Sequence, residues 1–190
     1  GKTTLGEILE EDLGIPLYRE LTKPETHELL ERFYADKPRW AFTLQVHFLN
    51  ERFRMIKESS SRGRGSLDRS IYGDRIFAAM LHADGDMTDE ELFTYDTLLD
   101  NMLEHAENPD LLVYLDCSVE TALARIKKRN RGSESGIPRE YLENLNARYL
   151  EWYAAYDRSP KILIDTEAHP LSTPRGRSHT VRRVADTLDR

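Results

Sequence analysis

Gly1-Lys2-Thr3-Thr4 opens the sequence and matches the second half of the phosphate-binding motif G-x-x-x-x-G-K-[ST]. In the complete motif, backbone N–H groups surround nucleotide phosphates, the lysine reaches the β- and γ-phosphates, and the hydroxyl binds Mg²⁺. A helical run from Leu5 to Leu13 follows at once. The alternative is an ordinary helix start with Thr3 or Thr4 as its N-cap. The phosphate-binding interpretation is favoured, and we expect the first strand and the opening glycine of the loop to precede Gly1 in the working protein.

The composition is that of one globular domain spanning residues 1–190. A net charge of −7 argues against a general binder of nucleic acids or of membrane surfaces. No apolar run approaches the roughly 20 residues of a membrane span. Cys117 is the single cysteine, which excludes an internal disulfide and fits a reducing cytosol, so we expect a cytoplasmic protein.

Helical periodicity alternates along the chain with short apolar runs. The pattern predicts helices over residues 5–13, 26–34, 40–57, 73–82, 88–104, 119–129 and 137–156, with strands over 14–18, 110–116 and 162–164. Thr88 and Ser118 are predicted as the N-caps of the fifth and sixth of these helices. Polar or Pro/Gly-rich loops are predicted over 59–66 and 169–178. Strands separated by long helices indicate βαβ units and a three-layer α/β fold. The near-continuous apolar run at 110–116 is typical of a parallel strand buried on both faces.

Two acidic segments follow predicted or possible strands. Glu20 lies just past the first strand, where a carboxylate can accept a proton from a substrate hydroxyl. Asp68-Arg69-Ser70, with Asp74 and Arg75 a turn later, can hold Mg²⁺-bound water and phosphate charge. The alternatives are a solvated loop acid at Glu20 and a helix-terminal acid with surface ion pairs at Asp68.

Arginines are dense at the end of the helix predicted over 119–129. Arg125, Arg129 and the following Arg131 could converge on a transferred phosphoryl group, which needs cations over its spread charge. The alternative is a solvated helix face that complements the dipole of the helix C-terminus.

One polar side chain interrupts the apolar face of the helix predicted over 40–57. Gln45 stands among Trp40, Leu44 and Phe48, and its amide can pair either with a base edge or with backbone. Trp40, Phe48 and Tyr34 could stack on a base or belong to the core, and both alternatives stay open.

In this order along the chain, these residues resemble the deoxyribonucleoside kinase family, especially the bacterial deoxyadenosine/deoxyguanosine kinases. The resemblance covers roughly residues 1 to 165 and includes the lid pattern Arg125-x-x-x-Arg129-x-Arg131-x-x-Glu134. It implies a P-loop kinase fold with a parallel five-stranded sheet, an Arg-rich lid and usually a homodimer. It also implies an enzyme that uses ATP and Mg²⁺ to phosphorylate the 5′-hydroxyl of a deoxyribonucleoside for nucleotide salvage.

The resemblance also implies roles for individual residues. It assigns the phosphates of ATP and Mg²⁺ to Gly1, Lys2, Thr3 and Thr4, the metal also to Asp68, and the border of the ATP adenine to Asp165. It makes Glu20 the general base, Arg69 the group that steadies it, and Arg125, Arg129 and Arg131 the lid. It assigns the nucleoside to Tyr34, Trp40, Gln45, Phe48 and Glu134, with the sugar 3′-hydroxyl held by Tyr34 and Glu134.

Two further positions bear on the choice of base. Arg52 follows Gln45 by seven residues, so two helical turns put both on one face. In the family, an arginine there and an acid at the place of Asp74 accompany purine and cytosine substrates, and thymidine-accepting members carry small or apolar residues. We therefore expect a preference for purines.

Two other functions share part of this pattern. A nucleoside monophosphate kinase of the thymidylate kinase type shares the loop, an Asp-Arg motif and an arginine lid, but its anionic acceptor would be repelled by Glu20. A nucleotide-binding regulatory subunit without catalysis would not need three lid arginines. Departures from the family pattern are Asn130, where relatives often have glycine, and the polar segment 62–67 before Asp68.

Overall fold

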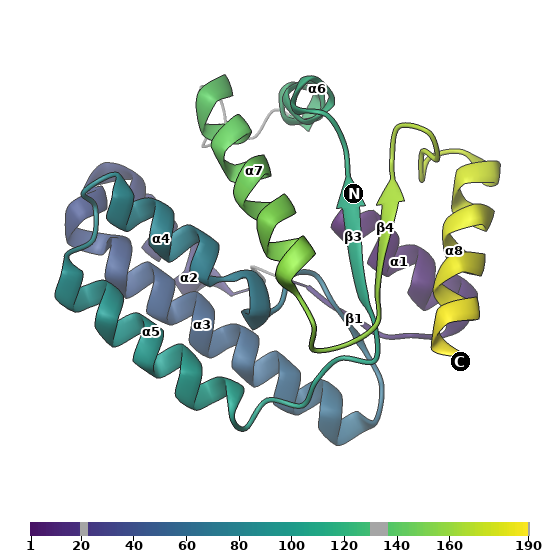
Figure 1. The fold of residues 1–190 in the computed structure, drawn as a ribbon, viewed down its shortest axis with the longest axis horizontal. Coiled ribbons are helices and arrows are strands. Elements are labelled where there is room, and N and C mark those ends of the chain that lie inside the picture. Colours follow the sequence, from purple (N-terminus) through teal and green to yellow (C-terminus); the bar gives the residue numbers. More distant parts are fainter. Residues whose placement is uncertain (20–22, 130–136, 190) are drawn as a thin grey trace. The chain divides into compact units, whose positions relative to one another are not determined.

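The computed structural model describes residues 1–19, 23–129 and 137–189, and the chain divides into two compact units. The central unit is Ile15–Glu107, and the terminal unit combines Gly1–Gly14 with Asn108–Arg190. Figure 1 shows the elements of both, coloured along the sequence. The α/β class expected from the sequence is therefore observed, with strands in each unit.

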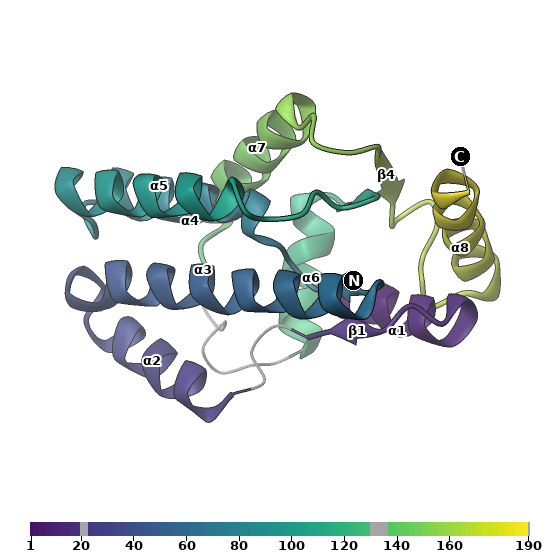
Figure 2. The same ribbon diagram turned by 90° about the horizontal axis from the view of Figure 1, so that it is seen from below.

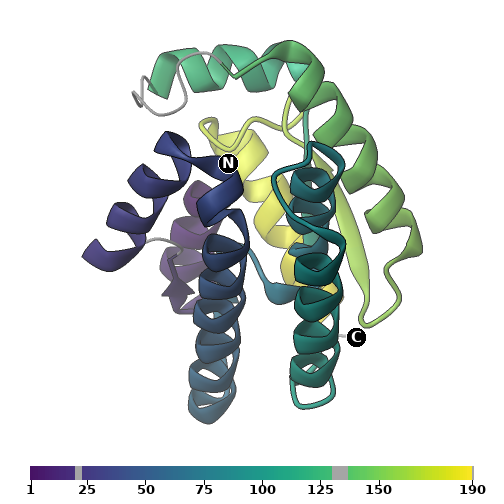
Figure 3. The ribbon, with the colours of Figure 1, turned by 90° about the vertical axis from the view of Figure 1, so that its left-hand side faces the viewer.

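Helices dominate the central unit. They are α2 (Pro24–Ala35), α3 (Lys37–Arg62), the short 3₁₀ turn η1 (Ile71–Gly73), α4 (Arg75–Ala83) and α5 (Asp89–Leu103). The long α3 packs against α2, α4 and α5, and Figure 2 shows α2 and α5 on different sides of it. Figure 3 shows α3 and α5 running side by side. The core between them is apolar and includes Phe33, Ala41, Leu44, Leu49, Ile71, Ala78, Tyr95 and Leu99.

Two short strands complete the central unit. β1 (Leu17–Tyr18) pairs in parallel with β2 (Ser66–Leu67). Gly65 makes this approach possible, because a Cβ atom there would lie 2.6 Å from the ring of Tyr18. The backbone N–H of Asp68 donates to the carbonyl of Tyr18 across 3.0 Å. The parallel pairing therefore brings the acidic motif after β2 to the same edge as the end of β1.

The terminal unit contains a longer parallel pair. β3 (Leu112–Asp116) and β4 (Lys161–Asp165) pair in register, with Asp116 opposite Asp165 at their carboxyl ends. α7 (Arg139–Ala155) packs against β3 through its aromatic rings, and the Tyr153 centroid lies 5.1 Å from that of Tyr114. α1 (Lys2–Leu13) contacts α8 (Pro174–Leu188), and α6 (Val119–Arg129) contacts α7. Figure 1 shows α7 on one side of the strands and α1 and α8 on the other.

A lysine caps the end of α7. Lys161, the first residue of β4, donates through Nζ to the carbonyl oxygens of Tyr153, Ala154 and Tyr156 at 2.6–2.9 Å. These carbonyls belong to the last turn of the helix, where they lack intrahelical donors and where the dipole favours a cation. One side chain therefore fixes both the end of α7 and the start of β4.

Most predicted elements are confirmed within a few residues, and the caps expected at Thr88 and Ser118 are present. Two loop predictions are wrong in part. Residues 59–62 continue α3, where Glu58 pairs with Arg54 and Arg62 on adjacent turns. Residues after Thr173 begin α8, because Thr173 caps Gly176 N–H and Pro174 suits the first turn.

The sheet differs from the sequence expectation. The described residues contain two parallel pairs, β1–β2 and β3–β4, and not one sheet of five strands. The residues of β3 are only partly buried, so the expected burial on both faces is not found. Among helices of the described chain, none combines the length and apolarity needed to cross a lipid bilayer.

Candidate active site

A buried ion pair lies at the centre of the nucleoside-binding residues predicted in the central unit. Arg52 on α3 donates through Nη1 to Oδ1 of Asp74, the residue preceding α4. The two residues are 4% and 2% exposed. Ionised groups this deeply buried need their partners, because desolvation of either charge alone is costly. The sequence-predicted combination of Arg52 with Asp74 is therefore formed in the fold.

Gln45 and Phe48 lie two turns and one turn, respectively, before Arg52 on α3. Gln45 is buried at 6% exposure on the inner side of this helix. The Arg52 guanidinium lies over the Phe48 ring, 4.8 Å from its centroid. α3 thus presents an amide, an aromatic ring and a paired guanidinium along one face.

Trp40 and Tyr34 have different surroundings. The guanidinium carbons of Arg32 and Arg39 lie 5.1 and 4.8 Å from the Trp40 ring centroid, and the ring packs against the core cluster. Tyr34 is 52% exposed and meets Phe33 edge to face. Trp40 therefore packs against the core and two guanidinium groups, and Tyr34 is the more accessible of the two predicted contacts.

The Asp68-Arg69-Ser70 motif follows β2 directly. Asp68 is buried at 9% exposure, which does not fit the alternative of a helix-terminal acid in surface ion pairs. Arg69 has a φ of 78°, the left-handed backbone conformation that large side chains rarely adopt. Its guanidinium lies 4.7 Å from the ring centroid of Phe77. An aspartate and an arginine are thus held close together in an uncommon backbone turn after the strand.

Two contacts fasten the start of α2 to α3. Lys23 pairs with Glu51 at 2.8 Å, and the Thr26 hydroxyl and His47 Nε2 lie 2.8 Å apart. Burial acts to raise the pKa of Glu51, but hydrogen bonds and charge from Lys23 and Arg54 outweigh it and leave this pKa lowered. Glu51 therefore stays ionised beside Arg52 and holds the segment that begins three residues after Glu20.

In the terminal unit, α1 begins at Lys2 with Gly1 as its N-cap and no capping side chain. Thr3 and Thr4 lie inside the first turn, so neither is the N-cap considered as the alternative. Gly1 lies against Leu115 of β3, and a Cβ atom on it would be 3.3 Å from that side chain. The N-terminus of α1, with its positive dipole, is thus near the carboxyl end of β3, as a phosphate-binding turn requires.

Arg125 of α6 is fixed at the ends of the strands. It donates to the hydroxyl and the carbonyl of Thr166 at 2.8 and 3.2 Å, and Thr166 donates to the carbonyl of Asp116. Thr166 is 3% exposed. This buried relay holds a guanidinium above the carboxyl ends of β3 and β4. The predicted lid arginine is therefore positioned by the loop after β4.

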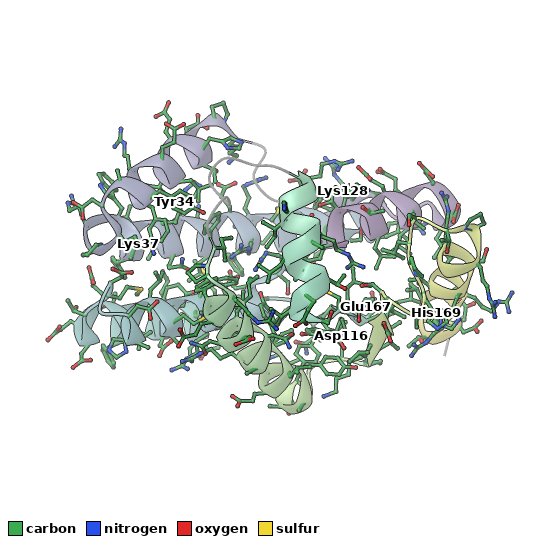
Figure 4. The ribbon with its side chains drawn as sticks, turned by 90° about the horizontal axis from the view of Figure 1, so that it is seen from above. Tyr34, Lys37, Asp116, Lys128, Glu167 and His169 are labelled. Atoms are coloured by element: carbon green, nitrogen blue, oxygen red, sulfur yellow. The ribbon has the colours of Figure 1, made fainter. Side chains whose placement is uncertain are left out.

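The loop after β4 is shaped by two acids. The Asp165 carboxylate accepts from the backbone N–H groups of Glu167 and Ala168, which lowers its pKa. Glu167 accepts from the hydroxyls of Thr121 and Ser118, which lower its pKa. Figure 4 labels Asp116, Glu167 and His169 in this region and Lys128 farther along α6. Asp165 thus orders this loop through its carboxylate.

Comparisons with known proteins identify the family of the chain. The deoxynucleoside kinase family matches residues 1–188. The deoxyguanosine kinase of Lactobacillus acidophilus is 38% identical over 99% of this chain and 86% of its own length. That of Lactobacillus johnsonii is 42% identical over 87% and 77%.

The chain belongs to the deoxynucleoside kinase family. It is an enzyme of that family, as the resemblance in the sequence implied. Among solved structures, the deoxyadenosine kinase of M. mycoides with bound dATP matches with a TM-score of 0.80 and 26% identity, covering 100% of this chain and 94% of that one. The same kinase with dCMP and dCDP matches with a TM-score of 0.81 and 27% identity, covering 100% and 93%.

Some predicted residues of this deoxynucleoside kinase cannot be located. Glu20, Arg131 and Glu134 lie outside the described residues, as does the side chain of Arg129. Other residues near the predicted site were not identified from sequence. Thr166 could have been suspected because it follows a strand end, but the Lys23–Glu51 pair joins positions 28 apart and leaves no local signal.

Proposed function

We propose that this kinase transfers the terminal phosphoryl group of ATP to the 5′-hydroxyl of a deoxyribonucleoside, with purines preferred. The observation that carries the proposal is the buried Arg52–Asp74 pair on the same helix face as Gln45. The names of the relatives support it, since they include deoxyguanosine and deoxyadenosine kinases. One relative acts on deoxyadenosine and deoxycytidine, and so cytosine stays open as a second base.

The chemistry of these side chains suits a neutral base. An amide offers a donor and an acceptor, a guanidinium offers donors, and a carboxylate offers acceptors. A base edge with the complementary groups can satisfy them, whereas the methyl group of thymine cannot. A site that leaves buried polar groups unpaired rejects the wrong substrate strongly.

The chain's residue types also fit the phosphate half of the reaction. ATP supplies the phosphoryl group, and Mg²⁺ shields its charge when bound. Thr3 offers a hydroxyl and the buried Asp68 a carboxylate, both oxygen ligands of the kind Mg²⁺ prefers. Within the described residues there is no cluster of three or more His, Cys, Asp or Glu that could hold a metal. Gly1, Lys2 and Thr4 would receive the phosphates, and Asp165 would border the adenine.

The remaining predicted roles concern the transfer itself. Glu20 would accept the proton of the 5′-hydroxyl, and Arg69 would steady it. Arg125, Arg129 and Arg131 would neutralise the charge on the moving group. Tyr34 and Glu134 would hold the sugar 3′-hydroxyl, while Phe48 and Trp40 would flank the base. The exposed ring of Tyr34 and the fixed guanidinium of Arg125 support two of these assignments.

Features of the whole protein belong to the same proposal. We infer one kinase domain over residues 1–190, since the family match runs through both units. The five-stranded, three-layer P-loop kinase fold with an arginine lid follows from the family resemblance, and the match to the deoxyadenosine kinase structures supports the P-loop kinase fold. A homodimer, a cytoplasmic location and a role in nucleotide salvage follow from the family resemblance alone.

A panel of acceptors tests the function. Purified protein with ATP and Mg²⁺ is offered the four deoxynucleosides and, separately, their 5′-monophosphates, and ADP formation is followed. We expect turnover with deoxyguanosine or deoxyadenosine and little with thymidine. Turnover only with monophosphates would favour the monophosphate kinase, and nucleotide binding without acceptor-dependent turnover would favour a regulatory subunit.

A further inference from the structure

Tyr95 of α5 carries a hydroxyl whose burial needs an explanation. The residue is 0% exposed and belongs to the apolar core of the central unit. Among the described residues its hydroxyl has no hydrogen-bond partner. Phenylalanine would fill the same space without burying an unpaired polar group, which costs free energy. A tyrosine at this position therefore suggests that its hydroxyl is used in another state of the enzyme.

Tyr95 is under the electrostatic influence of the Arg52–Asp74 pair, which is proposed to read the base. The adjacent residue, Asp96, holds Arg75 through two hydrogen bonds of 2.9 and 2.8 Å. Arg75 in turn follows Asp74 directly, so this bridge fastens the start of α4 to α5 beside Tyr95. The electrostatics agree, because burial raises the pKa of Tyr95 most, and the Asp74 charge raises it further while Arg52 opposes the rise.

We propose that Tyr95 is a positioning residue for nucleoside recognition, whose hydroxyl donates to the Asp74 carboxylate when a purine nucleoside is bound. This inference rests on the proposed function. Arg52 donates to Asp74 Oδ1. A base edge that hydrogen-bonds to Arg52 or Asp74 competes with this contact, and a carboxylate can accept several further hydrogen bonds. The Tyr95 hydroxyl then supplies such a donor and holds the carboxylate in place.

The test compares removal of two buried hydroxyls. Tyr95→Phe removes the hydroxyl and keeps the ring. Thr180→Val is the matched control, because Thr180 of α8 is also 0% exposed and its Oγ1 also has no hydrogen-bond partner in the described chain. For wild type and both variants, the Kd of deoxyguanosine without ATP is measured by calorimetry, with kcat, KM and Tm measured alongside.

The expected result separates binding from stability. Tyr95→Phe should keep or raise Tm while the Kd and KM of deoxyguanosine rise about tenfold, the loss expected for one hydrogen bond to a charged group. kcat should change less than KM. Thr180→Val should keep or raise Tm and leave the Kd of deoxyguanosine unchanged.

Three outcomes would overturn the inference. If the Kd of deoxyguanosine is the same for Tyr95→Phe and wild type, the hydroxyl has no role in nucleoside binding, and the kinase assignment stays intact. A lowered Tm together with weaker binding would mean that the hydroxyl supports the fold. A wild-type protein that neither binds nor phosphorylates any deoxynucleoside would overturn both this inference and the proposed function.

Discussion

The two units carry their charged groups in opposite ways. In the central unit, Arg52, Asp74 and Asp68 are buried, and the first two are bonded to each other. In the terminal unit, Lys2 and Asp165 are exposed. Buried charges are strongly coupled to their partners, whereas exposed ones are screened by water and salt. The difference indicates that the groups proposed to read the base are held in place by one another, while those proposed to handle phosphate stay solvated.

Breaking the buried pair should have the largest effect. Asp74→Ala leaves the Arg52 guanidinium buried without its carboxylate, so we expect the free energy of unfolding to fall by about 3–5 kcal/mol. Urea unfolding at equilibrium measures it. The double variant Arg52→Met/Asp74→Ala removes both charges and should recover much of the loss. If Asp74→Ala is as stable as wild type, the buried pair does not stabilise the fold, and the proposed contrast between the units is wrong.

The same double variant should change the choice of base. Unpaired buried polar groups cost about 1–3 kcal/mol each, so the preference for deoxyadenosine and deoxyguanosine over thymidine should fall by about 10²-fold or more. We expect loss of purine phosphorylation and gain of thymidine phosphorylation, read as kcat/KM for each nucleoside. If wild type already prefers thymidine, the specificity assignment is wrong although the kinase assignment survives.

Removing Glu20, the proposed general base, should slow the chemical step. Glu20→Gln keeps the shape of the side chain and loses its basicity, so kcat should fall by about 10²-fold or more, with KM changed less. Steady-state kinetics with deoxyguanosine measure this. Activity within about threefold of wild type, far below the loss expected for a general base, would exclude the role.

Truncating a lid arginine should affect transfer more than nucleoside binding. Charge is most exposed in the transition state, so Arg129→Ala should lower kcat by about tenfold or more. The Kd of deoxyguanosine without ATP should hardly change. Lys128→Ala, its neighbour on α6, is the control and should have little effect on either. Equal losses of kcat and of nucleoside affinity in Arg129→Ala would indicate a structural role.

Breaking an exposed cluster of ion pairs should have the smallest effect on stability. Arg177 on α8 donates to Asp12 and Glu11 on α1 at 2.8 Å, where all three groups meet solvent. Exposed pairs contribute little and are screened by salt. Arg177→Ala should therefore lower Tm slightly in low salt and not at all in high salt. A loss as large as that of Asp74→Ala would contradict the proposed contrast between the units.

The sequence predicted the positions of helices and strands better than it predicted how the strands pair. Helical periodicity located α5 and its cap at Thr88, because both signals are local. The combination of Gln45, Arg52 and Asp74 was also foreseen, through helical spacing and the family resemblance. The two-residue strands β1 and β2 were hard to see, since their pairing depends on Gly65 meeting Tyr18 across 47 residues of chain. The helix α8 was partly mistaken for a loop because its first turn carries proline and glycine.

Contacts between distant residues limited the site prediction. Arg125 was identified as a cation, but its attachment to Thr166 depends on how α6 meets the end of β4. Nothing in the sequence distinguishes Tyr95 from the other residues of the helix predicted over 88–104, since the influence of Asp74 on it depends on how α4 and α5 pack. Hydrogen bonds of this kind are set by tertiary packing and have no periodic signature.

The left-handed backbone at Arg69 has a consequence for how this protein can be improved. A residue with a Cβ atom is disfavoured at a φ of 78°, whereas glycine accepts it freely. Optimising the chain for heat resistance alone would therefore replace this arginine, and the substitution would look beneficial in any melting assay. The same replacement removes the guanidinium proposed to steady the general base. Variants of this turn must consequently be screened by turnover, since selection for thermal stability alone would favour a more stable but inactive enzyme.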